Sequence, residues 1–157
     1  MYYSTVYESP VGEMLIVSDT ESIIGISFKS ATDEELTVND DLPIFQKTKR
    51  WLDDYFNGLN PKIDFKLKVE GTEFRKRVWK ILSDIPYGET MTYGEIASMI
   101  SPEMSAQAVG GAVGANPIAI VIPCHRVLGK NARLTGYSAG VDKKIELLKI
   151  ENISYRW

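Results

Sequence analysis

The sequence predicts two domains: a small α/β domain over residues 1–71 and a mostly helical domain over residues 72–157. Three observations lead to this fold class. Short β-branched runs separated by turn residues fill most of the first part, whereas apolar residues at helical spacing fill the second. The net charge also changes sign: residues 1–71 carry 7 Lys/Arg and 13 Asp/Glu, which gives −6, and residues 72–157 carry 11 and 8, which gives +3.

The first domain is expected to be a small antiparallel sheet with one helix. Two β-branched runs, 14–18 and 23–28, are separated by a polar turn, which predicts a hairpin. Apolar residues recur at helical spacing over 43–57, and Gly58 follows as a stop signal. The expected order is strand 2–8, turn 9–12, strand 14–18, strand 23–28, loop 29–41, helix 43–57 and a half-buried strand over 63–69.

The second domain is expected to contain three helices, each with its own capping residue. Thr72 and Ser105 can each cap a helix, and Thr92 with Glu95 has the spacing of a capping box. The short turn between the last two helices is typical of a helix-turn-helix, and an ordinary helical hairpin is the alternative. The predicted helices cover 72–84, 92–100 and 105–115.

The third of these helices is built almost entirely from small residues. It has no Arg or Lys, and Gln107 is its only long polar side chain, so it is poorly equipped to read base edges. A smooth helix can instead lie against a DNA backbone without reading sequence, or it can pack tightly on another helix. Its small residues are Ala106, Ala108, Gly110, Gly111, Ala112, Gly114 and Ala115.

Composition excludes several classes of protein. A chain of 157 residues that is 44% apolar and 25% charged is typical of soluble globular proteins. No apolar run approaches the roughly 20 residues that a membrane helix needs, and no signal segment opens the chain, so we expect a cytoplasmic protein that does not bind membranes. The +3 half predicts where a polyanion would bind, although a chance imbalance on a solvated surface explains the charge equally well.

The chain has one Cys and one His, and they are neighbours in the segment Pro123-Cys124-His125-Arg126. These counts exclude an internal disulfide and a zinc site with four nitrogen and sulfur ligands. A thiol reacts as thiolate, which an adjacent His or cation promotes. Adjacent side chains point apart in a strand, so a relay from Cys124 to His125 would need a turn or a bridging water. An inert core thiol remains the alternative.

The segment Pro123-Cys124-His125-Arg126-Val127, together with Ala108-Val109-Gly110-Gly111-Ala112 and Asn116-Pro117, resembles the signature of the O6-alkylguanine-DNA alkyltransferases. The likeness extends upstream through Pro86-Tyr87-Gly88 and downstream through Gly136-Tyr137-Ser138, and it covers about residues 72–152 closely. The resemblance implies a ribonuclease-H-like first domain and a winged-helix-like second domain. It also implies a monomer that needs no cofactor and no metal.

The activity implied by the resemblance is direct reversal of DNA damage. The protein would bind double-stranded DNA, flip an O6-alkylguanine out of the helix and pass its alkyl group irreversibly to Cys124 in a single turnover. O4-alkylthymine is a second candidate substrate. His125 would activate Cys124 through water, and Glu151 would orient His125. From the residues alone, Glu151 could equally be a solvated carboxylate near a helix end.

The resemblance also implies the remaining site residues. Asn116 would fasten the turn before Cys124, for which a helix C-cap is the alternative, and Tyr93 would donate a hydrogen bond to the base. Many family members carry an arginine where this chain has Gln107, so we expect weaker or more salt-tolerant base flipping. The expected base pocket is formed by Tyr137, Ser138, Val127, Val113 and Ala119, and the expected DNA contacts are Ser105, Ala106, Gln107, Gly110 and Arg126.

Three other interpretations remain open from the sequence. A lesion sensor that binds alkylated DNA without reacting is disfavoured because Cys124 is present. A helix-turn-helix regulator is disfavoured by the lack of base-reading side chains, and a Cys–His hydrolase by the lack of an indicated oxyanion hole. The tail over residues 154–157 lies outside the resemblance and is assigned no role.

Overall fold

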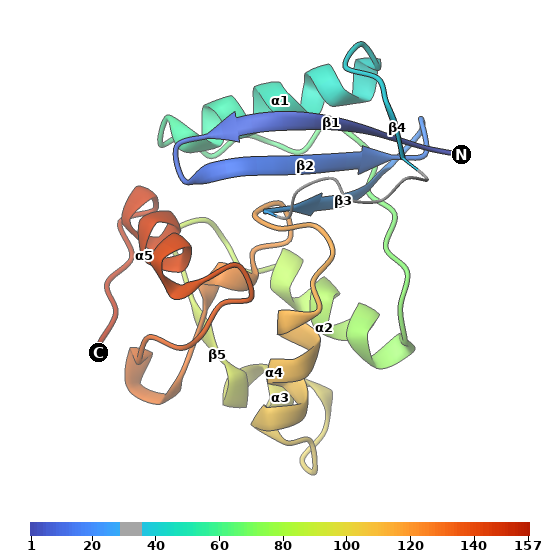
Figure 1. Cartoon of the computed structure of the whole chain (residues 1–157). Helices are drawn as coiled ribbons and strands as arrows, with labels where there is room; N and C mark the ends of the chain where they lie inside the picture. The colour runs from blue at the N-terminus through green and yellow to red at the C-terminus, as the bar shows by residue number, and fades with distance from the viewer. Residues whose placement is uncertain (29–35) are drawn as a thin grey trace. The chain divides into compact units, whose positions relative to one another are not determined.

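The computed structural model describes residues 1–28 and 36–157. The described chain divides into two units, of which the first comprises residues 1–69 with 117–119 and the second residues 70–116 with 120–157 (Figure 1). Residues 117–119 belong to the first unit because the carbonyl of Pro117 accepts from Ile26 N–H and Ala119 N–H donates to the Ile26 carbonyl, both at 3.0 Å.

The first unit contains a four-stranded sheet in the order β3-β2-β1-β4. The predicted hairpin is present, because β2 pairs antiparallel with β3 and also with β1. The prediction of a purely antiparallel sheet is wrong, since β4 pairs parallel with β1. The expected loop 29–41 contains β4, whose three residues are too few to show an alternating pattern; residues 29–35 of that loop lie outside the described residues. The strands are β1 (Tyr2–Ser9), β2 (Gly12–Ser18), β3 (Ile23–Ser27) and β4 (Leu36–Val38).

Helix α1 (Pro43–Phe56) forms where the spacing of apolar residues predicts it. Pro43 starts the helix, at a position where the missing N–H of proline costs no hydrogen bond. The helix lies along the sheet of its own unit, into whose core it buries Phe45, Leu52 and Tyr55 (Figure 1). Gly58 follows with a φ of +82°, a left-handed conformation that glycine adopts without strain.

The predicted strand over 63–69 does not form. Only Leu67 bridges Ile23, whose N–H donates to the Lys66 carbonyl at 2.8 Å and whose carbonyl accepts from Lys68 N–H at 3.0 Å. Phe65 and Leu67 are half-buried while the lysines are exposed. The alternating pattern therefore identified Phe65 and Leu67 as inward-facing but not Ile63, which is 47% exposed, and it did not show that the backbone pairs with one partner residue among those described.

The second unit contains the three predicted helices and a fourth, α5, that begins after Gly140. The side chains of Thr72 and Ser105 cap α2 and α4, and Thr92 with Glu95 forms the predicted capping box at α3. A short parallel pair, β5 with β6, was not predicted, because two residues per strand carry no periodic signal. The elements are α2 (Glu73–Ser83), β5 (Met91–Thr92), α3 (Tyr93–Ile100), α4 (Ala106–Gly114), β6 (Val127–Leu128) and α5 (Val141–Ile150).

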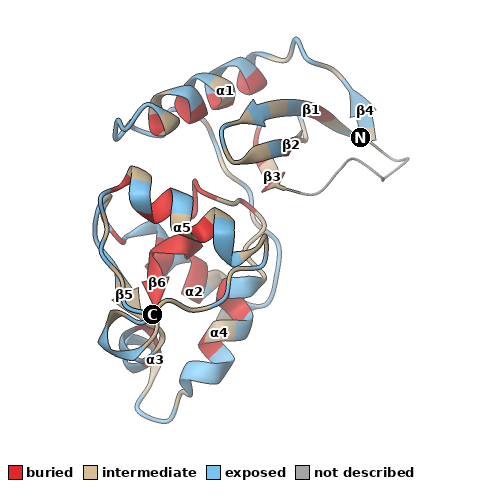
Figure 2. Cartoon of the chain, turned by 60° about the vertical axis from the view of Figure 1, so that its left-hand side comes forward, coloured by how far each residue is buried: buried red, intermediate tan, exposed pale blue. Residues whose placement is uncertain are grey.

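Helix α4 has one buried stripe and one bare, exposed face. Val109, Ala112 and Val113 are buried, whereas the first turn of the helix is exposed (Figure 2). A Cβ added at Gly111 or Gly114 would meet no atom within 4 Å. Tight helix packing therefore does not explain these two glycines, and the small residues leave a smooth surface open to a large partner.

Among residues 1–28 and 36–157, every helix is too short or too polar to span a lipid bilayer.

Candidate active site around Cys124

The segment that carries Cys124 is held in a compact turn. Cys124 opens a 3-10 turn, η1 (Cys124–Arg126), rather than lying in a strand, so the geometry that a Cys–His relay requires is available. Asn116 Nδ2 donates to the Ile122 carbonyl at 2.7 Å and thereby ties the end of α4 to the residues just before the turn. The C-cap of α4 is Ala115, so the capping alternative for Asn116 does not hold.

Behind Cys124, His125 and Arg126 share one buried carboxylate. His125 Nε2 lies 2.5 Å from Glu151 Oε2, and Arg126 Nε donates to Glu151 Oε1 at 2.8 Å. The backbone N–H of Gly88 also donates to Glu151 Oε1, at 3.0 Å. The side chains of His125 and Glu151 are fully buried. Glu151 is therefore not a solvated carboxylate, because it anchors a closed hydrogen-bonded network.

Arg126 does not reach a surface where it could contact DNA. Besides Glu151, its guanidinium donates to the Ile85 carbonyl at 2.8 Å and lies over the Tyr87 ring at 5.6 Å from the centroid. The side chain is only 11% exposed. The expectation that Arg126 binds DNA is therefore wrong, because the guanidinium already compensates the buried charge of Glu151.

The network sets the protonation states of its members. Burial alone would raise the pKa of Glu151, but the hydrogen bonds and charges of His125 and Arg126 lower it to about 2. Burial lowers the pKa of His125, against the opposing effect of Glu151. His125 is therefore neutral near pH 7. Because an ionised carboxylate only accepts, the proton of His125 is on Nε2, and Nδ1 is able to accept one.

Cys124 is a thiol in the resting protein. Burial raises its pKa, and the nearby Asn116 amide, Tyr137 hydroxyl and Lys144 ammonium offset part of that rise. These three groups can stabilise a thiolate once it forms, but burial keeps the resting group neutral. Reaction at Cys124 therefore requires a base, and His125 is the chain's one histidine.

A cavity of about 220 Å³ opens onto the Cys124 sulfur. This volume is below the range of drug-sized ligand sites and suits a single flat ring system. Tyr137 has a buried hydroxyl with no nitrogen or oxygen partner among the described residues, and Ser138 Oγ donates to the Gly114 carbonyl at 3.0 Å. The lining residues are Tyr93, Gly110, Val113, Gly114, Cys124, Gly136, Tyr137 and Ser138.

Two expected pocket residues lie elsewhere. Among the described residues, Ala119 is not part of this lining, and its N–H pairs with Ile26 in the first unit. Ala119 follows α4 closely in sequence, but the chain crosses to the other unit over 117–119. Val127 does not line the cavity either; it is fully buried, and its carbonyl oxygen accepts a hydrogen bond from Lys144.

Lys144 is the functional candidate that the sequence analysis missed. The residue is 1% exposed, and its ammonium donates to the Val127 carbonyl at 2.7 Å and to Thr135 Oγ1 at 3.0 Å. Thr135 Oγ1 in turn lies 3.0 Å from the Tyr93 hydroxyl, which connects the lysine to the cavity wall. Burial lowers the pKa of Lys144 to about 8, although the charge of Cys124 opposes this effect. A signal was present: Lys144 precedes Leu147 and Leu148 by three and four residues and so lies on the apolar stripe of α5.

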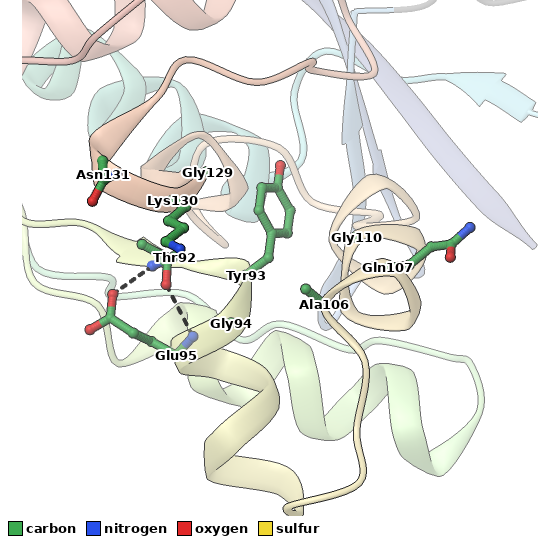
Figure 3. A pocket seen from close by; sticks show the side chains of 10 residues that line it. All are labelled: Thr92, Tyr93, Gly94, Glu95, Ala106, Gln107, Gly110, Gly129, Lys130 and Asn131. Carbon is green, nitrogen blue, oxygen red and sulfur yellow. Dashed lines mark hydrogen bonds between the residues drawn. The ribbon is translucent and has the colours of Figure 1, made fainter.

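Next to the cavity lies a wider groove of about 810 Å³ between α3, α4 and the turn after β6. Figure 3 shows Tyr93 standing between that turn and α4, with Gln107 on the opposite side of α4. Tyr93 and Gly110 line both the groove and the cavity. Ser105 is exposed at the start of α4, where it serves as the N-cap. The groove is lined by Thr92, Tyr93, Gly94, Glu95, Ala106, Gln107, Gly110, Gly129, Lys130 and Asn131.

The sequence matches two family models that together cover most of the chain. Residues 1–70 match the ribonuclease-like domain of 6-O-methylguanine DNA methyltransferase, and residues 73–153 match its DNA binding domain. The chain belongs to the 6-O-methylguanine DNA methyltransferase family. The resemblance read from the Cys124 motif is thereby confirmed, and so is the fold class, with a mixed sheet in place of an antiparallel one.

Individual members of the 6-O-methylguanine DNA methyltransferase family are similar over nearly the full chain. A methylated-DNA–protein-cysteine methyltransferase of Haemophilus influenzae is 47% identical over 98% of this chain and 88% of its own length. One from Methanosarcina acetivorans is 46% identical over 96% of this chain and 98% of its own. The crystal structure of Mycobacterium tuberculosis O6-methylguanine methyltransferase superposes with a TM-score of 0.87 and 39% identity, over 96% of this chain and 93% of that one. A Mycobacterium tuberculosis OGT in complex with DNA superposes with a TM-score of 0.84 at the same identity, over 96% of this chain and 91% of that one.

Proposed function

We propose that this protein repairs alkylated DNA by moving the alkyl group from O6 of a guanine to its own Cys124. The observation that carries the proposal is the position of the Cys124 sulfur. It lies at a cavity sized for one ring system, while the adjacent His125 is held by a buried carboxylate. Membership of the 6-O-methylguanine DNA methyltransferase family supports the same activity.

Activation of the thiol is assigned to His125. Neutral His125 accepts the Cys124 proton, directly or through one water, and Glu151 stabilises the imidazolium that results. Asn116, Tyr137 and Lys144 then surround the thiolate with a donor or a positive charge. The buried carboxylate therefore acts as the positioning group of a nucleophile–base–orienter set.

The transfer step is a single displacement. The thiolate attacks the alkyl carbon, a C–S bond forms, the C–O6 bond breaks, and its electron pair passes to the guanine ring. The guanine anion takes up one proton, so the reaction balances without an oxidant or a co-substrate. The hydrogen-bonded series Lys144–Thr135–Tyr93 leads from a cation to the cavity and can supply that proton or stabilise the anion. Because the thioether is stable, each molecule reacts once.

The groove beside the cavity is assigned to DNA. The smooth exposed face of α4 lets a duplex approach without steric conflict at Gly111 and Gly114. Because Tyr93 and Gly110 line both spaces, a base that leaves a duplex bound in the groove can enter the cavity between them. Flipping costs a few kcal/mol and is least costly for a badly paired base, which favours the lesion. Ser105, Ala106 and Gln107 are the proposed backbone contacts.

One experiment separates this function from its alternatives. The protein is incubated with duplex containing O6-methylguanine, and its intact mass is measured. We expect a gain of one methyl group that Cys124→Ala does not show. Binding of the lesion duplex without a mass gain would instead identify a lesion sensor, and equal binding of undamaged duplex without a mass gain would identify a regulator. A parallel incubation with O4-methylthymine duplex tests the second substrate, and sedimentation of the complex tests the monomer.

A further inference from the structure

The C-terminal tail and the turn after β6 enclose a second cavity of about 310 Å³. Backbone hydrogen bonds fix the tail there, because Arg156 N–H donates to the Ala132 carbonyl at 2.8 Å and Leu134 N–H donates to the Arg156 carbonyl at 2.6 Å. The tail therefore has a defined position relative to the turn. We call this cavity the tail pocket; it is lined by Lys130, Asn131, Arg133, Arg156 and Trp157.

Three basic side chains line the tail pocket, and no acidic side chain does. Lys130, Arg133 and Arg156 are all exposed. Within residues 1–28 and 36–157, none of their side chains forms an ion pair or a hydrogen bond. Three basic side chains around one cavity outnumber the single α-carboxylate of Trp157 and create a positive potential that attracts a polyanion.

The tail pocket adjoins the groove that we assign to DNA. Lys130 and Asn131 line both spaces, and Figure 3 shows them across the groove from Ala106. A strand that leaves the groove past Lys130 therefore meets the tail pocket next. Trp157 is 81% exposed at its edge and packs edge-to-face on Tyr155, with the ring centroids 5.7 Å apart. The indole thus offers a fixed apolar surface for a sugar or an unstacked base.

We propose that the tail pocket binds backbone phosphates of the DNA that flanks the lesion. The proposal rests on the proposed function, since it extends the same DNA interface beyond α3 and α4. Arg133 and Arg156 bind phosphate oxygens, while Trp157 covers the neighbouring sugar. The contact involves no base edges, so it strengthens binding to every sequence equally and leaves the chemistry at Cys124 unchanged.

The salt dependence of duplex binding tests the charged contacts. Each phosphate contact contributes about 0.9 to the slope of log K against log salt, which is about a threefold change in affinity between about 50 and 200 mM salt. The double variant Arg133→Ala/Arg156→Ala is expected to lower the slope by about 2. Between about 50 and 200 mM salt its duplex affinity should therefore fall about tenfold less than that of the wild-type protein. Arg77→Ala is the matched control, because Arg77 is an exposed arginine of α2 that lines neither the groove nor the tail pocket.

A fluorescence measurement tests where the DNA strand lies. Trp51 and Trp79 are 8% and 3% exposed, so Trp157 is the tryptophan that a neutral quencher such as acrylamide reaches. We expect saturating duplex to protect this emission, and Trp157→Phe to remove the quenchable component. Quenching that is unchanged by DNA would overturn the placement of the strand at the tail pocket.

Transfer of methyl from the free base O6-methylguanine separates this proposal from the proposed function. We expect Arg133→Ala/Arg156→Ala to accept methyl from the free base at the wild-type rate. Its duplex binding should still show the reduced slope of log K against log salt. A double variant with the wild-type slope would overturn the tail pocket while leaving alkyl transfer intact. A wild-type protein that neither binds duplex nor gains a methyl group would overturn both.

Discussion

Replacing Glu151 with glutamine changes the charge of the buried network while keeping its size and shape. In the wild-type protein, Arg126 Nε and Gly88 N–H both donate to Glu151 Oε1, and Glu151 Oε2 faces His125 Nε2. In the variant, those two donors hold the amide oxygen, so the amide NH₂ group faces His125. A donor at this position requires His125 Nε2 to accept, which moves the proton of the ring to Nδ1. His125 then has the wrong tautomer to act as a base.

Two magnitudes follow for Glu151→Gln. A wrong histidine tautomer in a nucleophile–base–orienter set costs roughly 10³- to 10⁴-fold in rate, so we expect at least about a 10³-fold slower transfer. The drop in the pKa of Glu151 from its usual 4.5 to about 2 corresponds to about 3 kcal/mol of stabilisation of the charged form. Loss of that charge also leaves Arg126 buried without compensation, which typically costs about 3–5 kcal/mol. We therefore expect the free energy of unfolding to fall by about 3 kcal/mol.

Single-turnover transfer from an O6-methylguanine duplex measures the rate, and urea unfolding measures the stability. Glu146→Gln is the matched control, because Glu146 lies on α5, the helix that Glu151 caps, is half exposed and pairs with Lys149 at 3.6 Å. The control is expected to change stability by less than about 0.5 kcal/mol and to leave transfer unchanged. Folded Glu151→Gln protein that transfers methyl within about threefold of the wild-type rate would refute the assigned role of Glu151.

Three further predictions concern stability at low pH, the role of the buried Lys144 in transfer, and Gln107, which stands where many family members have an arginine. Because the pKa of folded Glu151 is lowered from 4.5 to about 2, its stabilisation is complete above about pH 4.5 and is lost as the pH falls toward 2. Wild-type urea midpoints should therefore drop over this range more than those of Glu151→Gln; parallel curves would contradict the shift. Since the pKa of Lys144 is about 8, the transfer rate should decline above that pH as the ammonium loses its proton, and Lys144→Met should show a low rate with no such decline. If the transfer rate of Lys144→Met declines above about pH 8 as much as that of the wild type, Lys144 is not the group whose titration causes the decline. Gln107→Arg adds a cation at the groove and should strengthen duplex binding, raise the salt slope by about 1 and speed transfer, whereas no change in affinity or rate would show that position 107 does not assist flipping.

The sequence predicts a structural feature correctly where residues close together in the chain form it. Caps at Thr72, Thr92 and Ser105 are satisfied by atoms within three residues, so composition and spacing reveal them. The region 63–69 shows the opposite case. Its alternation reflects the burial of Phe65 and Leu67, but strand formation depends on partners far along the chain, and among the described residues the one bridge joins Leu67 to Ile23.

In the candidate site, too, residues within the motif could be identified from the sequence, whereas contacts between distant residues could not. The family resemblance of the motif identifies Cys124, His125 and Glu151, and the structure joins His125 to Glu151 in a buried network directly behind Cys124. The resemblance placed Arg126 among the DNA contacts, but its side-chain partners, Glu151 and the Ile85 carbonyl, are distant in sequence and become visible only in the fold. Lys144 was missed for the same reason, since its acceptors at Val127 and Thr135 become visible only once the chain is folded.

The stoichiometry and position of the transferred methyl group test whether each molecule takes one methyl group from O6 of guanine onto Cys124. Increasing amounts of O6-methylguanine duplex are added to a fixed amount of protein, repaired guanine is counted, and the modified peptide is identified by mass. We expect repair to stop at one guanine per protein molecule and the methyl group to lie on Cys124. Repair that continues beyond one guanine per molecule, or a methyl group on any other residue, would contradict this expectation.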